Sequence, residues 1–261
     1  MEEKNCPSAE IFFKKNLKKH TGIKDIRFIL AVGSGKGGVG KTTVSAILSF
    51  ALSKAGYSVG IFDLDFYGPN INLVLGLNKK PIVEFGKIKP VSSNNIKVMS
   101  LALLISEKEP VFMRGLMASK LLQELLQKVE WGPLDFLILD LPPGTGDIFL
   151  TMLDFFNPEG FILVTTPHKL AISDAKRTLA ILKENNMPIL GVVKNMSDFF
   201  ENETAFQQFL NEQKLNVLFE IPVLKELSKT ENLLEVFKLP EKQKFLEDIA
   251  EKILDKIFRI H

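Results

Sequence analysis

Cysteine is nearly absent from this chain of 261 residues, in which Cys6 is the single example. One thiol cannot form an internal disulfide, which excludes the class of small disulfide-stabilised secreted domains and suits a reducing cytosol. Hydrophobic runs are also short, since none approaches the roughly 18 apolar residues that a membrane-spanning helix needs. The acidic start, Met1–Lys4, is not followed by the apolar segment of a signal peptide. We therefore expect a cytoplasmic protein.

Charge of one sign is not in large excess either. The 33 lysine and arginine residues nearly balance the 31 aspartate and glutamate residues, for a net charge of +2. This balance gives no global attraction to nucleic acid or to an anionic membrane, and we predict neither as a partner. Residues 1–24 form a polar lead-in with a basic cluster, which we interpret as a solvated helix face or arm, with a docking patch as the alternative. Residues 25–261 are long enough and apolar enough to form one large α/β domain.

A glycine-rich stretch over residues 33–43 organises the rest of the sequence. Residues 28–32 before it are apolar and rich in β-branched side chains, as in a buried parallel strand. Residues 44–55 after it carry apolar side chains at helical spacing. Strand, glycine loop and helix are the context of a phosphate-binding loop, and residues 35–42 fit its pattern G-x-x-x-x-G-K-T. Because glycine lets backbone N–H groups approach phosphate closely, we interpret the stretch as a nucleotide-binding loop rather than a structural turn.

The residue types of this loop indicate separate roles. Lys41 supplies a positive charge for the β- and γ-phosphates, and the Thr42 hydroxyl supplies an oxygen for Mg²⁺. The helix that begins near Lys41 adds N–H groups and the positive end of its dipole. The predicted nucleotide contacts are Gly35, Lys36, Gly37, Gly38, Val39, Gly40, Lys41, Thr42 and Thr43.

Carboxylates follow two further apolar strands. The strand over residues 59–62 leads to Asp63 and Asp65, and the strand over residues 136–139 leads to Asp140. Open parallel sheets bind ligands at the carboxyl ends of their strands. We therefore predict that Asp140 holds Mg²⁺ in the manner of a Walker B aspartate, that Asp63 supports the same ion, and that Asp65 positions the attacking water. The alternative is that Asp63 and Asp65 are turn and cap carboxylates.

The remaining segments continue an alternation of strands and helices. Strands are predicted over residues 96–101, 161–166, 189–194 and 217–221, and helices over 118–129, 172–182 and from around Glu241 onward. Residues 77–95 are expected to be an irregular, turn-rich connection. Residues 141–147, rich in proline and glycine, are a candidate switch loop. The pattern predicts a doubly wound, mostly parallel sheet flanked by helices.

Two features have both a functional and a structural interpretation. His168 follows a strand, and we expect a hydrogen-bonded loop residue rather than a ligand. Apolar residues between Phe245 and Phe258 share one face of the terminal helix, as in a membrane-targeting helix. Such helices favour a basic polar face, whereas this polar face mixes acidic and basic residues. We therefore expect the terminal helix to pack on the sheet.

Lys36 is an extra lysine that an ordinary phosphate-binding loop does not require. With it, residues 36–43 resemble the deviant P-loop of the MinD, ParA and nitrogenase-iron-protein class. The resemblance implies a homodimer that sandwiches the nucleotides. It also implies a catalytic role for Lys36, which would reach the phosphates of the partner subunit.

Four segments together resemble the Mrp/ApbC family of ATP-dependent iron–sulfur cluster carriers. They are residues 36–43, 63–69, 114–115 and 140–147, and the similarity covers roughly residues 25–200. The resemblance implies a slow, switch-type, Mg²⁺-dependent ATPase with a MinD/ParA-like P-loop fold. It also implies that Asn195 recognises adenine, so that ATP is preferred to GTP. An amide suits this role because it offers both a donor and an acceptor.

The sequence departs from this family after Asn195. There the carriers place a Cys-x-x-Cys that holds a cluster at the dimer interface, whereas residues 198–203 of this chain contain no cysteine. A [4Fe–4S] cluster usually takes four thiolates, and a homodimer of this chain offers only two copies of Cys6. Pairing Cys6 with His20 would require two arms to become ordered, at an entropic cost. We predict that the isolated protein binds no stable iron–sulfur cluster.

Two function classes remain after this departure. The leading hypothesis is an assembly or carrier factor related to iron–sulfur maturation, a cluster-free subunit that acts through a maturation partner or an apo-protein client. The alternative is a ParA/MinD-type ATPase that positions DNA, flagella or division machinery. Residues 64–70 and 141–147 favour the first class, because they match the carrier family rather than MinD or ParA.

Overall fold

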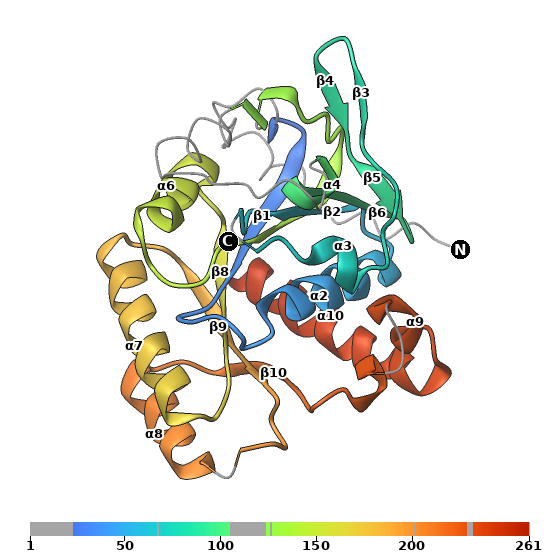
Figure 1. Cartoon of the computed structure of the whole chain (residues 1–261). Coiled ribbons are helices and arrows are strands. Elements are labelled where there is room, and N and C mark those ends of the chain that lie inside the picture. The colour runs from blue at the N-terminus through green and yellow to red at the C-terminus, as the bar shows by residue number, and fades with distance from the viewer. Residues whose placement is uncertain are drawn as a thin grey trace.

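The computed structural model describes residues 23–66, 68–104, 124–125, 127–200, 202–228 and 232–260. Within them, an eight-stranded sheet has the order β10-β9-β8-β1-β7-β2-β6-β5 (Figure 1). Every neighbouring pair is parallel except β5 and β6, which are antiparallel. The predicted doubly wound, mostly parallel α/β fold is therefore confirmed.

The central strands consist of continuous apolar residues because helices cover both faces of the sheet. The strands of the main sheet are β1 (Ile26–Gly33), β2 (Val59–Asp63), β5 (Val91–Ser93), β6 (Ile96–Ser100), β7 (Leu134–Asp140), β8 (Gly160–Thr165), β9 (Ile189–Asn195) and β10 (Val217–Ile221). A separate hairpin consists of β3 (Ile82–Glu84) and β4 (Lys87–Lys89). All residues of β2 and β8 are buried, as are all but one in β1 and in β7.

Two apolar clusters lie on opposite faces of the sheet. The helices are α2 (Lys41–Lys54), α3 (Ile71–Val74), α4 (Leu101–Leu104), α6 (Asp147–Phe156), α7 (Lys169–Glu184), α8 (Glu203–Gln213), α9 (Leu233–Phe237) and α10 (Pro240–Ile260), with a 3₁₀ turn η2 (Lys225–Ser228). One cluster contains residues of α2, α9 and α10, and the other contains residues of α6, α7 and α8. Figure 1 shows these two groups of helices on either side of the strands.

The terminal helix α10 packs into the domain, as expected. Its apolar residues Leu246, Ile249 and Ile253 are buried in the same cluster as α2. It contacts α2 chiefly, and β10 and β9 to a smaller extent, so its main neighbour is another helix rather than the sheet (Figure 1). None of the helices in the described ranges combines the length and apolar character that crossing a membrane requires.

The expectation of an irregular connection over residues 77–95 is wrong. Strands β3, β4 and β5 all lie in this stretch, and β5 extends the main sheet as its edge strand. Each strand has only three residues, too few for an alternating pattern to be recognised in the sequence. Most of the helix expected over residues 118–129 lies outside the described residues, as do residues 1–22, Tyr67 and residues 114–115.

Candidate nucleotide-binding site

The glycine-rich loop joins β1 to α2 at the carboxyl edge of the sheet, as the sequence predicts. Gly40 precedes α2 with a left-handed φ of 85°, and a Cβ there would lie 2.1 Å from Nδ2 of Asn195. At Gly35, an added Cβ would lie 2.4 Å from the backbone of Asp174 in α7. Glycine is therefore required at both positions, because the loop is held tightly against α7 and the end of β9.

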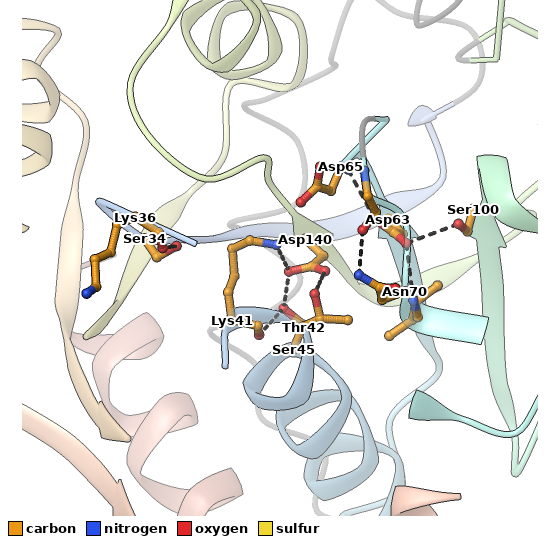
Figure 2. Close-up of polar contacts among 12 residues, drawn as sticks. Ser34, Lys36, Lys41, Thr42, Ser45, Asp63, Asp65, Asn70, Ser100 and Asp140 are labelled. Atoms are coloured by element: carbon orange, nitrogen blue, oxygen red, sulfur yellow. Dashed lines mark hydrogen bonds and ion pairs between the residues drawn. The ribbon is translucent and has the colours of Figure 1, made fainter. Parts of the chain in front are cut away.

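Asp140 is the centre of a buried polar cluster at the end of β7. Lys41 Nζ donates to its Oδ1 at 2.8 Å, and Thr42 Oγ1 donates to its Oδ2 at 2.7 Å. Ser45 Oγ donates to Oδ1 at 2.9 Å (Figure 2). Asp140 is fully buried and Lys41 is 7% exposed, so the ammonium group compensates a carboxylate that would be costly to bury alone. Three residues with predicted roles are thus in direct contact.

Ser45 is a member of this cluster that the sequence did not reveal. Its hydroxyl also bonds the carbonyl of Lys41 at 3.1 Å, one turn back in α2. A serine within an apolar helical pattern gives no signal of a carboxylate partner on another strand. The contact depends on β7 lying next to β1, which only the sheet order discloses.

Asp63 lies beside Asp140 because the two residues are register partners on neighbouring strands. Its Oδ2 accepts from Ser100 Oγ at 3.0 Å and from the Ile71 N–H at 3.3 Å, and its Oδ1 accepts from the Asp65 N–H at 3.1 Å. Burial, together with repulsion from Asp140, raises the pKa of Asp63 to about 7. Asp63 therefore caps the turn to α3, which is the structural role considered as the alternative, and the raised pKa favours its neutral form beside Asp140.

The oxygen donors of this cluster suit Mg²⁺. They are the hydroxyl of Thr42 and the carboxylates of Asp140 and Asp63, which are hard ligands. Mg²⁺ is usually held by one or two carboxylates together with substrate phosphates, rather than by a cage of protein ligands. The described part of the chain has no cluster of three or more histidine, cysteine, aspartate or glutamate side chains able to hold a metal.

Asp65 and Lys36 lie at the margin of the cluster. Asp65 Oδ1 accepts from the Gly68 N–H at 3.2 Å, and Figure 2 shows the Asp65 side chain beside Asp63, on the side toward Asp140. Lys36 is half-buried in the loop, and its side chain extends away from Lys41 and Asp140 (Figure 2). The structure thus places Asp65 near the predicted metal site, whereas Lys36 is directed out of its own site.

A cavity of about 290 Å³ lies beside the glycine loop. Its lining consists of Gly40, Thr43, Asn195, Met196, Phe199, Pro222, Val223 and Leu224. Asn195 is buried at the end of β9, and its Nδ2 donates to the Val39 carbonyl at 2.8 Å. Apolar walls with one buried amide suit a flat aromatic ring such as a purine. Phe199 and the residues after β10 had no signal in the sequence, because they meet Asn195 only in the folded sheet.

His168 is a hydrogen-bonded residue at a helix start, which confirms the expectation. It precedes α7, and its Nδ1 accepts from the Leu170 N–H at 3.3 Å. Its ring lies 5.3 Å from the ring of Phe200. Cys6 and His20, the two residues considered for an iron–sulfur cluster, lie outside the described residues.

Residues 25–258 match the model of a ParA-group family described as the NUBPL iron-transfer P-loop NTPase. A protein of Rickettsia felis named iron-sulfur cluster carrier protein is 39% identical over 217 residues, covering 82% of this chain and 67% of that protein. Its namesake in Escherichia coli K12 is 42% identical over 192 residues, covering 73% of this chain and 52% of that protein. The chain thus spans between about half and two thirds of the length of these curated relatives.

Two solved structures share the fold of this chain. A nucleotide-binding protein of Archaeoglobus fulgidus in complex with ADP matches with a TM-score of 0.69 and 33% identity, over 88% of this chain and 93% of that chain. The cell division ATPase MinD of Pyrococcus furiosus matches with a TM-score of 0.64 and 24% identity, over 87% of this chain and 98% of that chain.

Proposed function

This chain belongs to the NUBPL iron-transfer P-loop NTPase family, and from that membership we propose that it is a slow, Mg²⁺-dependent ATPase that serves iron–sulfur maturation as a nucleotide-switched homodimer. The observation that carries the proposal is the convergence of Lys41, Thr42 and Asp140 at the carboxyl edge of the sheet. We assign this ATPase domain to residues 25–261, preceded by the lead-in of residues 1–24, and we place the protein in the cytoplasm.

The buried cluster exchanges partners when ATP binds. Lys41 leaves the carboxylate of Asp140 and takes the β- and γ-phosphates, since it is the cation already held at the start of α2. Thr42 and Asp140, supported by Asp63, would hold Mg²⁺, which neutralises charge on the transferred phosphoryl group. Ser45 keeps its bond to Asp140 Oδ1 and so fixes the carboxylate while Lys41 moves.

Hydrolysis requires a positioned water and a further cation. Asp65 orients the water, because it lies beside the metal ligands (Figure 2). Lys36 of each subunit serves the site of its partner, a role supported by a side chain that extends away from its own Lys41 and Asp140 (Figure 2). In the candidate switch loop, the Gly144 N–H donates to the Ser34 carbonyl at 3.0 Å. This bond couples the switch loop to the glycine loop that holds the phosphates.

Asn195 selects adenine over guanine. Its Nδ2 donates to the Val39 carbonyl, so the amide oxygen would serve as the acceptor for the base. The 6-amino group of adenine donates to such an acceptor, whereas the 6-oxo group of guanine cannot. The cavity next to Gly40 and Thr43 would receive the ring.

The function class follows from the curated relatives. These relatives are named iron-sulfur cluster carrier proteins, while residues 198–203 of this chain lack a Cys-x-x-Cys. We therefore assign the chain to a cluster-free subunit that acts with a maturation partner or an apo-protein client. The likeness to MinD, at 24% identity, shows the fold alone and does not support a role in spatial positioning.

Anaerobic reconstitution with iron and sulfide tests this assignment. We expect purified protein to hydrolyse ATP with Mg²⁺ and to stop when the metal is chelated, while retaining no stoichiometric iron after desalting. Absorbance and iron content report the cluster, and Cys6→Ser is the matched variant. Near-stoichiometric iron that disappears in Cys6→Ser would contradict the cluster-free assignment. A lack of Mg²⁺-dependent ATP hydrolysis would contradict the ATPase.

A further inference from the structure

The hairpin of β3 and β4 stands out from the body of the protein beyond the edge strand β5 (Figure 1). All three residues of β3 are exposed, and in β4 Ile88 alone is buried. The hairpin is attached through the middle of β4, where the Glu130 N–H donates to the Ile88 carbonyl at 2.9 Å and Ile88 pairs with Val129. Nearer the turn, Lys87 Nζ donates to the Gln127 carbonyl at 3.1 Å, so the hairpin is held along β4 while the side chains of β3 remain exposed.

Exposed apolar side chains follow β3 to the turn of this hairpin. Val83 is 61% exposed, Ile82 is 56% exposed and Phe85 is exposed at 105% of its reference area. Val83 pairs with Ile88 across the hairpin, so these two residues share one face, and Phe85 follows β3 as the first residue of the turn. Ile88 is buried in the core, whereas Val83 and Phe85 are exposed to solvent. Clustered exposed apolar residues of this kind mark interaction sites more often than isolated ones do.

The turn between the strands is strained by its first residue. Phe85 has a φ of 50° and Gly86 a φ of 74°, which is the pattern of a two-residue turn with two left-handed positions. Such turns favour Asn-Gly, and a bulky side chain at positive φ is disfavoured. Packing does not offset this strain, because Phe85 is fully exposed. Neither the local geometry nor burial within the described residues accounts for a phenylalanine at this position.

The surroundings of the hairpin are positively charged. Residues 79–89 contain four lysines and one glutamate. A cavity of about 610 Å³ at the base of the hairpin is lined by Lys87, Lys89 and Lys97, which outnumber the carboxylates of Asp25 and Glu130 in the same lining. A partner that fits this surface therefore carries negative charge around an apolar centre.

We propose that the β3–β4 hairpin docks a protein partner through an apolar pocket that receives Phe85 and is edged by carboxylates. The inference rests on the proposed function only for the kind of partner. That partner would be a maturation factor or a client protein, which is bound only transiently. A small apolar centre with a charged rim suits such a transient contact. The surface does not favour a lipid bilayer, because Glu84 directly precedes Phe85 and pairs with Lys87 across the hairpin, which would bring charges to the inserted tip.

Photo-crosslinking from the hairpin tip tests the proposal. The full chain is expressed in its own cells with p-benzoyl-phenylalanine at position 85, and at position 258 on α10 as the matched exposed site. We expect a protein adduct from position 85 that position 258 does not give. The captured protein is identified, purified and titrated against the unmodified chain.

The titration uses variants that separate docking from folding. Phe85→Asn removes the aromatic ring but favours the positive φ of the turn, so its thermal midpoint should stay equal or rise while affinity falls on the order of tenfold or more. Paired Lys79→Glu and Lys80→Glu substitutions should slow association and weaken its dependence on salt. Leu239→Asn, at another exposed apolar side chain, is the control that should bind normally.

Several outcomes would overturn the proposal. They are adducts with lipid only, adducts with a second copy of this chain only, no adduct at position 85, and unchanged affinity in Phe85→Asn. ATP hydrolysis is measured in the same preparations and should be unaffected by Phe85→Asn. Loss of the proposed ATPase function would thus appear in the unmodified chain, independently of the hairpin result.

Discussion

The carboxyl edge of the sheet and the β3–β4 hairpin are built on opposite principles. At the sheet edge, Lys41, Asp140 and Asp63 are buried polar groups with hydrogen-bond partners inside the chain. On the hairpin, Val83 and Phe85 are apolar groups in solvent. The first region is stabilised by contacts within the chain. The second makes physical sense when a surface outside the chain covers it.

Lys41→Ala tests the first region with the largest expected effect. ATP hydrolysis should be abolished, because Lys41 is the cation held at the start of α2 for the β- and γ-phosphates. The variant also leaves Asp140 buried without its cation, which should lower the free energy of unfolding by about 3–5 kcal/mol. Turnover and thermal unfolding measure the two effects separately.

Lys89→Ala is the matched change on the hairpin. Its ammonium group forms an ion pair with Glu84 in which both side chains are about half exposed. Exposed pairs contribute little to stability, so neither turnover nor the thermal midpoint should change measurably. Equal losses in the two lysine variants would break the contrast between the regions, and normal turnover in Lys41→Ala would refute the site.

Lys36→Ala and Asp65→Ala sharpen the comparison of the two regions, because they test whether a partner subunit completes the site at the sheet edge. Lys36→Ala should lose turnover by roughly 10³-fold while binding ADP normally, since its cation acts on the γ-phosphate of the other subunit. Asp65→Ala should bind ATP and accumulate as a dimer, because hydrolysis stops before the switch loop relaxes. Light scattering with ATP gives the oligomeric state, and a monomeric Asp65→Ala would count against the sandwich dimer.

The difference between the buried sheet edge and the exposed hairpin also explains which features the sequence could predict. Gly35, Gly40, Lys41 and Thr42 were found because phosphate chemistry restricts both residue type and spacing. Asp140 was found because a carboxylate directly after an apolar strand is typical of the aspartate that supports Mg²⁺ beside a phosphate-binding loop. The fold class followed from long apolar strands alternating with helices, which are the strongest periodic signals.

The elements that were missed have weak or purely spatial signals. Strands β3 and β4 have three residues each, and Phe85-Gly86 does not resemble the Asn-Gly that usually marks a tight hairpin. Ser45 and Phe199 join the candidate site only because distant strands become neighbours. Such contacts are set by sheet order, which a single sequence does not encode locally.

The pH dependence of stability tests the charge balance at the sheet edge. Burial and repulsion from Asp140 raise the pKa of Asp63 from 3.8 to about 7. The folded chain therefore binds this proton more tightly than the unfolded chain, and the resulting stabilisation is complete below pH 3.8 and lost as pH rises through about 7. A shift of this size is worth on the order of 4 kcal/mol.

Asp63→Asn should remove that dependence. The amide keeps an oxygen acceptor for Ser100 but carries no charge, so the variant should unfold at the same denaturant concentration at pH 5 and pH 8 without Mg²⁺. The unmodified chain should be less stable at pH 8 than at pH 5. Glu84→Gln on the hairpin is the control that should leave the pH profile unchanged. Parallel profiles for the unmodified chain and Asp63→Asn would show that Asp63 is ionised throughout.

Among the changes at the sheet edge, Asn195→Ala has the smallest expected effect and tests how the base is recognised. The substitution removes the amide oxygen proposed to accept from adenine, so affinity for ATP should fall by about tenfold, the cost of one hydrogen bond in a buried site. Affinity for GTP should change much less, because the 6-oxo group of guanine cannot donate to that acceptor. Fluorescent ATP and GTP analogues measure both affinities in one titration series.

Asn195→Asp is the informative companion, since a carboxylate keeps an acceptor for adenine but cannot donate to the Val39 carbonyl. Retained preference for ATP in Asn195→Asp, with its loss in Asn195→Ala, would assign selection to the oxygen. Equal loss of ATP and GTP binding in both variants would instead show that Asn195 acts by holding the glycine loop.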